Sequence, residues 1–312
     1  MNSFGFLDLV ASEYFSNQHS AWFDRVVQTE IQTNFTNLQK THPSYLFSEF
    51  NLFYSTERRL ALATNEASYL EWFESRIDLF NKICLPSIES LALKPTCWFL
   101  LCDIPQSPAE ESLLKLLTNL SDCYTVVTCD FRNANSDADR HYILKNLLIK
   151  RCISAHLSNS SYEAIITSRL DTDDCLGSLY FYNLYKYLYL SSRFGSGHIS
   201  EDFIVNFPVG AQIVTTDDGQ TGLPTHNCKG LIFGENCFTS RVEYGKSPES
   251  INTVWSCPHD EVFGVLPVRN LVTQSPAWYQ FVHGRNVQNT SVESLYSLNH
   301  SGLPAHIKNY LT

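Results

Sequence analysis

The feature that most constrains this chain is an apolar run, Ile165 to Leu170, that leads directly into three carboxylates within four residues. The run is β-prone and predicts a strand. Asp171, Asp173 and Asp174 follow it, and carboxylates packed this closely repel one another. A site that keeps all of them ionised at neutral pH needs a positive charge nearby, most economically a divalent cation. The segment therefore predicts a strand that delivers a metal site.

An acidic turn is the alternative interpretation, because Asp and Thr are ordinary turn residues after a strand. The context favours a site, since the segment Leu176 to Leu190 after the acids is rich in Leu and Tyr. The acids then lie at a strand-to-helix junction, and ligands of open α/β sheets bind beyond the carboxyl ends of the strands. Mg²⁺ and Mn²⁺ take oxygen ligands and leave room for substrate phosphates. The Asp-x-Asp-Asp pattern therefore suits a metal bound to a nucleotide diphosphate.

Composition limits the class of protein. A chain of 312 residues with 44% hydrophobic residues can bury a substantial core. The net charge of −10 and the pI near 5.4 argue against a nucleic-acid partner. No stretch reaches the roughly 18 to 20 apolar residues that span a bilayer, so only peripheral membrane contact stays open. The 10 cysteines form no C-x-x-C pair and mostly lie in apolar segments, which predicts reduced thiols in a cytoplasmic protein.

The order of the predicted elements indicates an α/β fold. Apolar positions at helical spacing predict an N-terminal helical extension over residues 1–44. Beyond it, strands and helical segments alternate in the manner of βαβ units, which implies a largely parallel sheet. The predicted strands are Tyr45–Tyr54, Cys97–Ile104, Tyr124–Phe131, Glu163–Leu170, Phe203–Thr216 and Gly230–Gly234. The predicted helices are Ser68–Leu91 with a break near Pro86, Ala109–Leu120, Asp137–Leu157, Leu176–Ser191 and Pro304–Leu311, and short helices mixed with loops are expected from Ser247 onward.

Three segments, in order along the chain, carry a resemblance to a known family. They are Trp72 to Ser87, Thr167 to Asp174, and Trp278 to Asn286. In these segments the chain resembles the rhamnosyltransferases, a group of glycosyltransferases with the GT-A type of fold and a DxDD motif. The resemblance implies a GT-A-like, Rossmann-type central sheet, mostly parallel and flanked by helices. The N-terminal extension lies outside the likeness.

The resemblance also implies an activity and a division of the chain. It implies transfer of a deoxyhexose, such as rhamnose, from a nucleotide-diphosphate donor to a glycan or glycoconjugate acceptor. Residues 45–312 would form one glycosyltransferase domain, with a nucleotide-sugar-binding half over 45–175 and an acceptor-binding half over 176–312. The expected cofactor is Mn²⁺ or Mg²⁺.

Roles can be assigned to the acids on this basis. We expect Asp173 and Asp174 to bind the cation that bridges the diphosphate, while Asp171 orients the ribose or completes the outer ligand shell. The cation would neutralise the charge that builds up on the departing nucleoside diphosphate. By analogy with GT-A enzymes, His283 supplies a further metal ligand. A lone histidine is as often a satisfied structural group.

Three arginines are expected to contact the donor, and two of them, Arg169 and Arg285, have a plainer alternative. Arg76 belongs to the first segment of the resemblance. Arg169 comes from the same strand as the acids and would contact phosphate or nucleobase, or else form a structural ion pair with one of the acids. Arg285 would meet a phosphate, or else would simply be exposed.

If the sugar is transferred with inversion, a general base must take the proton of the acceptor hydroxyl. Asp260 and Glu261 are the candidates, at a plausible helix start. Asp260 is preferred because the helix dipole holds a first-turn acid, although a helix cap is an equally good interpretation. The other candidates are Glu201, Asp202 and the Asp217–Asp218 pair, of which the last fits a hairpin turn before Gly219.

Two other functions could use the same acids. A metal-dependent phosphohydrolase or nucleotidyltransferase also relies on carboxylate-bound cations, but the sequence has neither a P-loop nor a second acidic cluster. A non-catalytic carbohydrate-binding protein would have no need for three acids at one strand end, and 312 residues is large for such a module.

Overall fold

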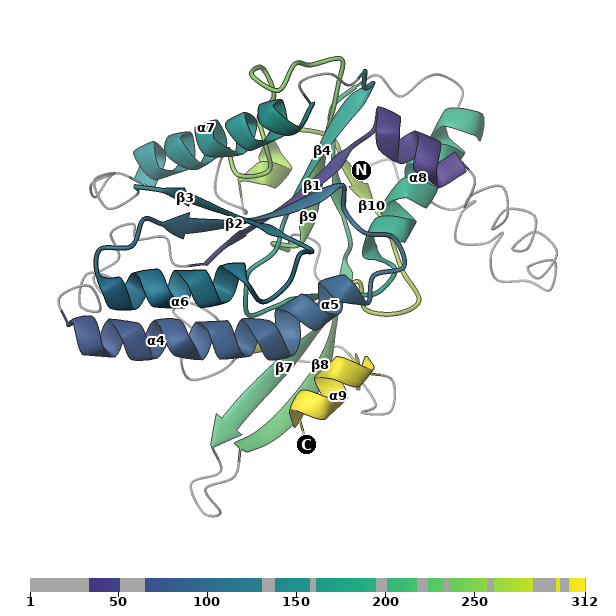
Figure 1. The fold of residues 1–312 in the computed structure, drawn as a ribbon. Helices are drawn as coiled ribbons and strands as arrows, with labels where there is room; N and C mark the ends of the chain where they lie inside the picture. The colour runs from purple at the N-terminus through teal and green to yellow at the C-terminus, as the bar shows by residue number, and fades with distance from the viewer. Residues whose placement is uncertain are drawn as a thin grey trace.

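The computed structural model describes residues 34–50, 65–130, 138–157, 161–194, 201–217, 224–232, 236–256, 261–282, 296–297 and 303–311. Two sheets organise these residues (Figure 1). The larger, seven-stranded sheet has the order β10 (Val268–Asn270), β6 (Phe203–Asn206), β9 (Thr239–Tyr244), β4 (Ala164–Arg169), β1 (Ser44–Glu49), β2 (Cys97–Asp103) and β3 (Thr125–Cys129). The five-stranded sheet has the order β12 (Tyr296–Ser297), β8 (Pro224–Ile232), β7 (Val209–Asp217), β11 (Trp278–Val282) and β5 (Cys175–Leu176).

The large sheet is mostly parallel, which confirms the predicted α/β class. β1 pairs in parallel with β2 and β4, β2 with β3, and β10 with β6. Only β9 runs antiparallel to its two neighbours, β4 and β6. The strand order reverses at β1, because β2 and β3 lie on one side of it and β4 on the other. The carboxyl ends of β1 and β4 therefore meet at a topological switch point, where open α/β sheets bind their ligands.

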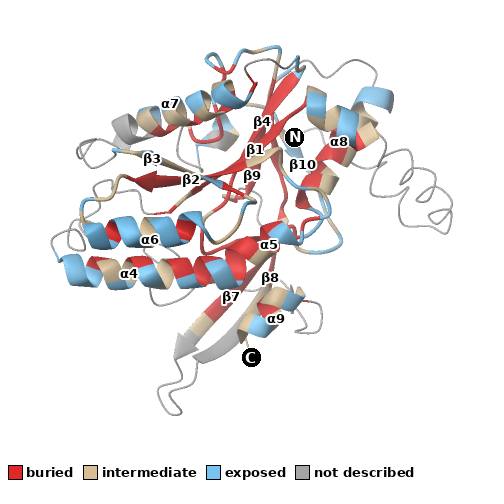
Figure 2. Ribbon diagram, in the orientation of Figure 1, coloured by how far each residue is buried: buried red, intermediate tan, exposed pale blue. Residues whose placement is uncertain are grey.

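Helices cover both faces of this sheet. α7 (Ala138–Leu157) lies on one side, and α4 (Glu66–Leu79) and α6 (Pro108–Thr118) lie on the other (Figure 1). Side chains of a strand alternate between faces, so Leu46 enters the core beneath α4 while its neighbours Tyr45 and Phe47 enter the core beneath α7. Figure 2 shows the resulting buried layer along the strands. Burial on both faces explains why these strands read as nearly continuous apolar runs.

The helix predicted to break near Pro86 is instead continued by a π-helical segment. α4 passes into η1 (Phe80–Cys84), and α5 (Leu85–Glu89) follows without an interruption. The amide of Leu85 bonds to the carbonyl of Phe80, five residues earlier. A proline ring would clash with the carbonyl four residues before it, so we attribute the absence of a break to the wider turn ahead of Pro86.

Two predicted strands have different bounds in the structure. The segment Phe203–Thr216 is divided into β6 and β7, which belong to different sheets. Pro208 lies between them, and proline lacks the amide that a continuous ladder requires. Of the predicted strand Gly230–Gly234, residues 230–232 are the end of a longer strand, β8, which pairs antiparallel with β7, and residues 233 and 234 lie outside the described residues.

The second half of the chain holds more strands than predicted. The short helices expected after Ser247 are represented in the described residues by one 3-10 turn, η3 (Val262–Gly264), whereas β9, β10 and β11 were not predicted. The helix predicted from Leu176 begins at Tyr180 as α8 (Tyr180–Phe194), because Cys175 and Leu176 pair with β11. The last predicted helix is present as α9 (Ala305–Leu311).

Of the predicted N-terminal extension, residues 34–41 are helical and Phe35 is buried in the main core. Residues 1–33 lie outside the described residues. No helix in the described part of the chain combines the length and the hydropathy of a membrane-spanning segment.

The junction between the two sheets is closely packed at Gly210, which yields a stability prediction. A Cβ atom there would lie 2.0 Å from the Trp278 ring. That ring is fixed, since its Nε1 donates to the carbonyl of Phe207 at 2.8 Å and it stacks on Phe238 at 4.7 Å. We expect Gly210→Ala to lower the free energy of unfolding by about 1–3 kcal/mol in a denaturant titration. Gly264→Ala, where a Cβ meets nothing within 4 Å, should change it by less than about 0.5 kcal/mol. Equal effects of the two would contradict the packing.

Candidate functional site

The three acids lie on a tight turn at the carboxyl end of β4. The amide of Asp174 bonds to the carbonyl of Asp171 at 3.1 Å, which closes the turn. The hydroxyl of Thr172 donates to the carbonyl of Glu49, the last residue of β1, at 3.3 Å. The turn is thus attached to both strands of the switch point. An Asp- and Thr-rich turn was the plain interpretation of the sequence, and the structure contains that turn at the place where a ligand site is expected.

Each carboxylate has a different environment. Asp171 is the accessible one, with 42% of its side chain exposed. Asp173 is 10% exposed and forms an ion pair with Arg76 at 2.6 Å. Asp174 is 1% exposed and accepts the amide of Phe281 at 2.8 Å. The acids therefore do not form one equivalent set of ligands.

Arg76 supplies the positive charge that the crowded acids require. One of its terminal nitrogens lies 2.6 Å from Asp173, and the other donates to the Thr172 hydroxyl at 2.6 Å. Arg76 comes from the last turn of α4, next to the π-helical segment, and 15% of its side chain is exposed. It was predicted as a donor contact, and in the structure it contacts the acid turn. A guanidinium held in this way neutralises a carboxylate without a metal.

Arg169 forms the ion pair that was the alternative to a donor contact. Its Nη2 lies 3.8 Å from Asp171 Oδ1. Its guanidinium carbon lies 4.1 Å from the centroid of the Trp255 ring. Arg169 and Asp171 together form the edge of the acid turn on the side of α7.

Of the three acids, Asp174 has the surroundings that most oppose ionisation of its carboxyl group. Burial raises the pKa of its carboxyl well above the usual range, and the nearby charges of Asp173 and Asp171 raise it further. Its second oxygen, Oδ2, is buried and has no hydrogen-bond partner within the described part of the chain. A buried acceptor without a donor is costly, which adds to the cost of ionising Asp174 in the fold.

The donor atoms present suit a hard cation. Asp171 and Asp173 present oxygen, and Mg²⁺ is commonly bound by one or two carboxylates plus substrate phosphates. Within the described residues no group of three His, Cys, Asp or Glu side chains forms a complete metal site. Further ligands would therefore come from a substrate or from residues outside the described part of the chain.

Four predicted site residues lie outside the described residues: His283, Arg285 and the candidate bases Asp260 and Asp218. The chain leaves the described part at Val282, one residue after Phe281, whose amide binds Asp174. The three segments of the family resemblance thus meet in space, because Arg76 and Phe281 both bind the acid turn.

Glu261, the second candidate base, is exposed in the turn just before η3. The helix expected to start at Asp260 is in the described residues a three-residue 3-10 helix, Val262–Gly264. A helix dipole of the strength expected for a full α-helix is therefore absent at Glu261.

Sequence reasoning missed Lys145, Glu49 and Trp255. Lys145 is 1% exposed and hydrogen-bonds to Glu49 at the end of β1. Its Nζ lies 4.3 Å from the centroid of the Trp255 ring. Burial lowers the pKa of Lys145, and Glu49 opposes this change. No local signal marks these residues, because they are distant in sequence and meet only in the folded chain.

The cysteines near the acids are structural. Cys84 Sγ lies 3.9 Å from the carbonyl of Asp171, and Cys175 Sγ lies 3.3 Å from the carbonyl of Ile83. Burial raises the pKa of both thiols well above the usual range, so they stay protonated at neutral pH. Neither has the thiolate character of a nucleophile. All nine cysteines in the described part of the chain are free, in agreement with the predicted absence of disulfides among them.

No protein-family model matches this sequence, and no curated protein matches it. Among solved structures, S. aureus TarS 1-349 is similar with a TM-score of 0.34 and 10% identity, over 77% of this chain and 60% of that one. This chain thus spans less than two thirds of that structure.

Two further similar structures are named as sugar transferases. A protein from Desulfovibrio desulfuricans G20, described as a nucleotide-diphospho-sugar transferase, has a TM-score of 0.27 and 9% identity over 78% of this chain and 82% of its own. Mouse xyloside xylosyltransferase 1 has a TM-score of 0.24 and 13% identity over 54% of each chain. These likenesses are distant, so the function proposed below rests on the geometry of this site.

The pairing of Arg76 with the acid turn predicts a large loss of stability when the arginine is removed. Arg76→Ala removes the ion-pair partner of the buried Asp173 carboxylate, which typically costs about 3–5 kcal/mol. Lys82→Ala is the matched control on the same helical segment, because Lys82 pairs with Asp78 at 2.7 Å while both side chains are more than half exposed. That change should cost less than about 1 kcal/mol. Denaturant unfolding measures the loss of unfolding free energy in both variants. Similar losses in the two would show that the Arg76–Asp173 pair stabilises the fold no more than an exposed ion pair does.

The environment of Asp174 predicts a pH-dependent difference between wild type and Asp174→Asn. A carboxyl whose pKa is higher in the folded than in the unfolded chain contributes stability at low pH and loses it as the pH rises. Asparagine can still accept the Phe281 amide but cannot ionise. We therefore expect the variant to gain stability relative to metal-free wild type as the pH rises from about 4, the usual pKa of Asp, toward 7. Unfolding curves that stay parallel across this range would contradict the assignment.

Proposed function

We propose that this protein is a metal-dependent glycosyltransferase that uses a nucleotide-diphosphate sugar as its donor. The observation that carries the proposal is the position of the acid turn, with its exposed Asp171, at the carboxyl ends of β1 and β4. This edge is the switch point of the sheet, where nucleotides bind in open α/β folds. Three acids that share one turn at that edge suit the diphosphate of such a donor through a bridging cation.

In this proposal Asp171 and Asp173 hold Mn²⁺ or Mg²⁺, with His283 as a further ligand. Asp174 was also expected to bind the cation, but no group of three such side chains in the described residues fits a metal ion, so Asp174 is given a structural role. When bound, the cation would offset the negative charge of the departing nucleoside diphosphate. Arg76 keeps Asp173 in place and limits the net charge of the turn, while Asp174 fixes the end of β11 through the Phe281 amide. Arg285 is proposed to meet a donor phosphate, because it lies in the segment that follows β11.

The sugar and the acceptor are proposed from the family resemblance. The sugar would be rhamnose or a related deoxyhexose, and the acceptor a glycan or glycoconjugate. Transfer with inversion requires a base, for which Asp260 is proposed and Glu261 is the second choice. The base would take the proton of the acceptor hydroxyl while the hydroxyl oxygen attacks the anomeric carbon of the donor sugar. The bond from that carbon to the nucleoside diphosphate would break, and the nucleoside diphosphate would leave.

A panel of nucleotide sugars with Mn²⁺ tests the reaction class. Slow donor hydrolysis to free sugar and nucleoside diphosphate is the expected result. Release of nucleoside monophosphate or inorganic phosphate would replace the proposal with a phosphohydrolase or nucleotidyltransferase. Glycan binding without any turnover would replace it with a carbohydrate-binding protein.

The exposed carboxylate provides the cleanest variant. Asp171→Asn should weaken Mn²⁺-dependent binding of the nucleoside diphosphate at least tenfold, which is about 1.4 kcal/mol, as measured by calorimetry. Its ion pair with Arg169 is long, at 3.8 Å, and 42% of the Asp171 side chain is exposed, so the fold should be retained. Asp78→Asn, an exposed acid on α4, is the matched control and should bind as wild type does. Wild-type affinity in Asp171→Asn would remove the metal assignment.

A further inference from the structure

Trp255 is a buried indole that contacts two cations from different elements. Its ring centroid lies 4.1 Å from the guanidinium carbon of Arg169 and 4.3 Å from the ammonium of Lys145. Only 2% of Trp255 is exposed. Cations over an indole are attracted by the negative face of the ring, and more strongly where water is excluded. The ring therefore holds both cations at one place.

Each of these cations is paired with an acid at the carboxyl end of a strand. Lys145 bonds to Glu49 at the end of β1, and Arg169 lies 3.8 Å from Asp171 beyond the end of β4. Because β1 and β4 are parallel neighbours, both acids lie at the same edge of the sheet. Trp255 thus contacts the cation of each of two ion pairs, one beyond the end of β1 and the other beyond the end of β4.

Within the described residues, no hydrogen bond holds the indole in place. Trp255 Nε1 is buried and has no partner in the part of the chain that the structure describes. A buried unsatisfied donor costs free energy. What the residue contributes is the ring, which packs on Ile251 and Val254 in the apolar cluster beneath α7 and contacts the two cations.

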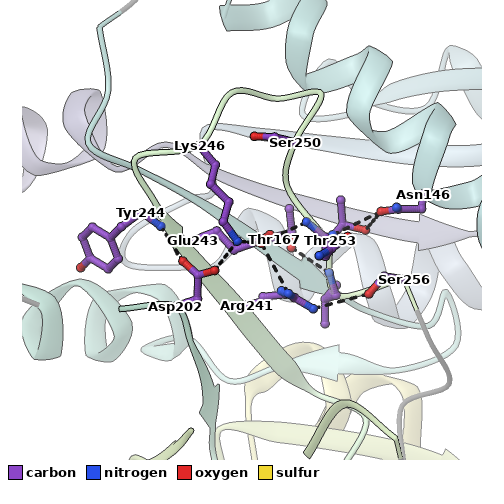
Figure 3. A network of polar contacts seen from close by, with 12 residues as sticks. Asn146, Thr167, Asp202, Arg241, Glu243, Tyr244, Lys246, Ser250, Thr253 and Ser256 are labelled. Carbon is purple, nitrogen blue, oxygen red and sulfur yellow. Dashed lines mark hydrogen bonds and ion pairs between the residues drawn. The ribbon is translucent and has the colours of Figure 1, made fainter. Parts of the chain in front are cut away.

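The backbone that carries Trp255 is fixed at four consecutive amides. Each amide donates to a side-chain oxygen, and the acceptors, on β9, α7, β4 and the loop itself, are labelled in Figure 3. The bonds are Asn252 to Glu243 at 3.0 Å, Thr253 to Asn146 at 3.2 Å, Val254 to Thr167 at 2.9 Å and Trp255 to the Thr253 hydroxyl at 3.2 Å. The loop therefore has little freedom to move the ring.

A buried ion pair on β9 lies beneath this loop. Glu243 and Arg241 are 1% and 4% exposed and lie two residues apart on one face of the strand (Figure 3). Glu243 also accepts Lys246 at 3.0 Å, and Arg241 reaches the Ser256 hydroxyl at 3.5 Å. The pair thus fixes the loop on both sides of Trp255.

We propose that Trp255 is a positioning residue that holds Arg169 and, through it, the exposed carboxylate of Asp171 in the orientation for donor binding. This inference rests on the function proposed above. The buried network around Glu243 holds the loop so that the ring stays against the guanidinium.

The test compares two apolar replacements of Trp255, one with an aromatic ring and one without. Trp255→Met fills much of the space but offers no ring to the cations, whereas Trp255→Phe keeps one. In calorimetry with UDP, dTDP and GDP plus Mn²⁺, we expect Trp255→Met to weaken nucleotide affinity about tenfold. Trp255→Phe should restore it to within about threefold of wild type. In donor hydrolysis the Met variant should raise KM more than it lowers kcat.

Trp98→Met is the matched control. Trp98 is as deeply buried but packs among the rings of Phe80 and Tyr124, and its Nε1 donates to Ser48. This variant should lose thermal stability while keeping nucleotide affinity. The inference is overturned if Trp255→Met binds as wild type, or if Trp98→Met loses as much affinity. Wild-type protein that binds none of the nucleotides would instead refute the proposed function.

Discussion

Crowding of three carboxylates at the end of one buried strand is the constraint on which the rest of the site depends. The like charges of Asp171, Asp173 and Asp174 cannot share a turn without partners from elsewhere in the chain. Each acid receives a different one. Arg76 reaches Asp173 from α4, the Phe281 amide reaches Asp174 from β11, and Arg169 pairs with Asp171. The separate environments leave one of the three carboxylates, that of Asp171, partly open to solvent.

The elements that supply these partners are those that join the two sheets. α4 continues through a π-helical segment whose residues contact the turn through Cys84 and the start of β5 through Cys175. β11 belongs to the second sheet and pairs with β5 directly after the acids. The site therefore lies where the large sheet, the second sheet and the α4 to α5 segment meet. Such convergence explains how a tight turn can be held rigidly enough to present a carboxylate in one orientation.

The sequence predicted strands best where a strand is buried on both of its faces. β1, β2 and β4 are covered on both faces, so their apolar runs could be recognised as strands. β9 was missed because Arg241 and Glu243 lie within it, and these charges are tolerated only because they pair with each other and with the loop beyond. β5 and β11 are short, and their pairing depends on contacts across roughly a hundred residues. The acid turn was predicted because its residues are consecutive. The ion pair of Arg169 with an acid was one of two alternatives, because both residues are close in sequence. The contacts of Arg76 and of the Phe281 amide with the turn were not predicted, because they depend on tertiary structure.

The proposed cation would complete a site that is only partly balanced by this chain's own charges. Arg76 and Arg169 supply two cations for three carboxyl groups. A crystal soaked with a nucleoside diphosphate and Mn²⁺ tests this most directly. We expect an anomalous manganese peak at coordination distance, about 2.1 Å, from an oxygen of Asp171 or Asp173, with the diphosphate on its other side. A nucleotide bound elsewhere, or an acid turn without manganese at saturating concentration, would contradict the account.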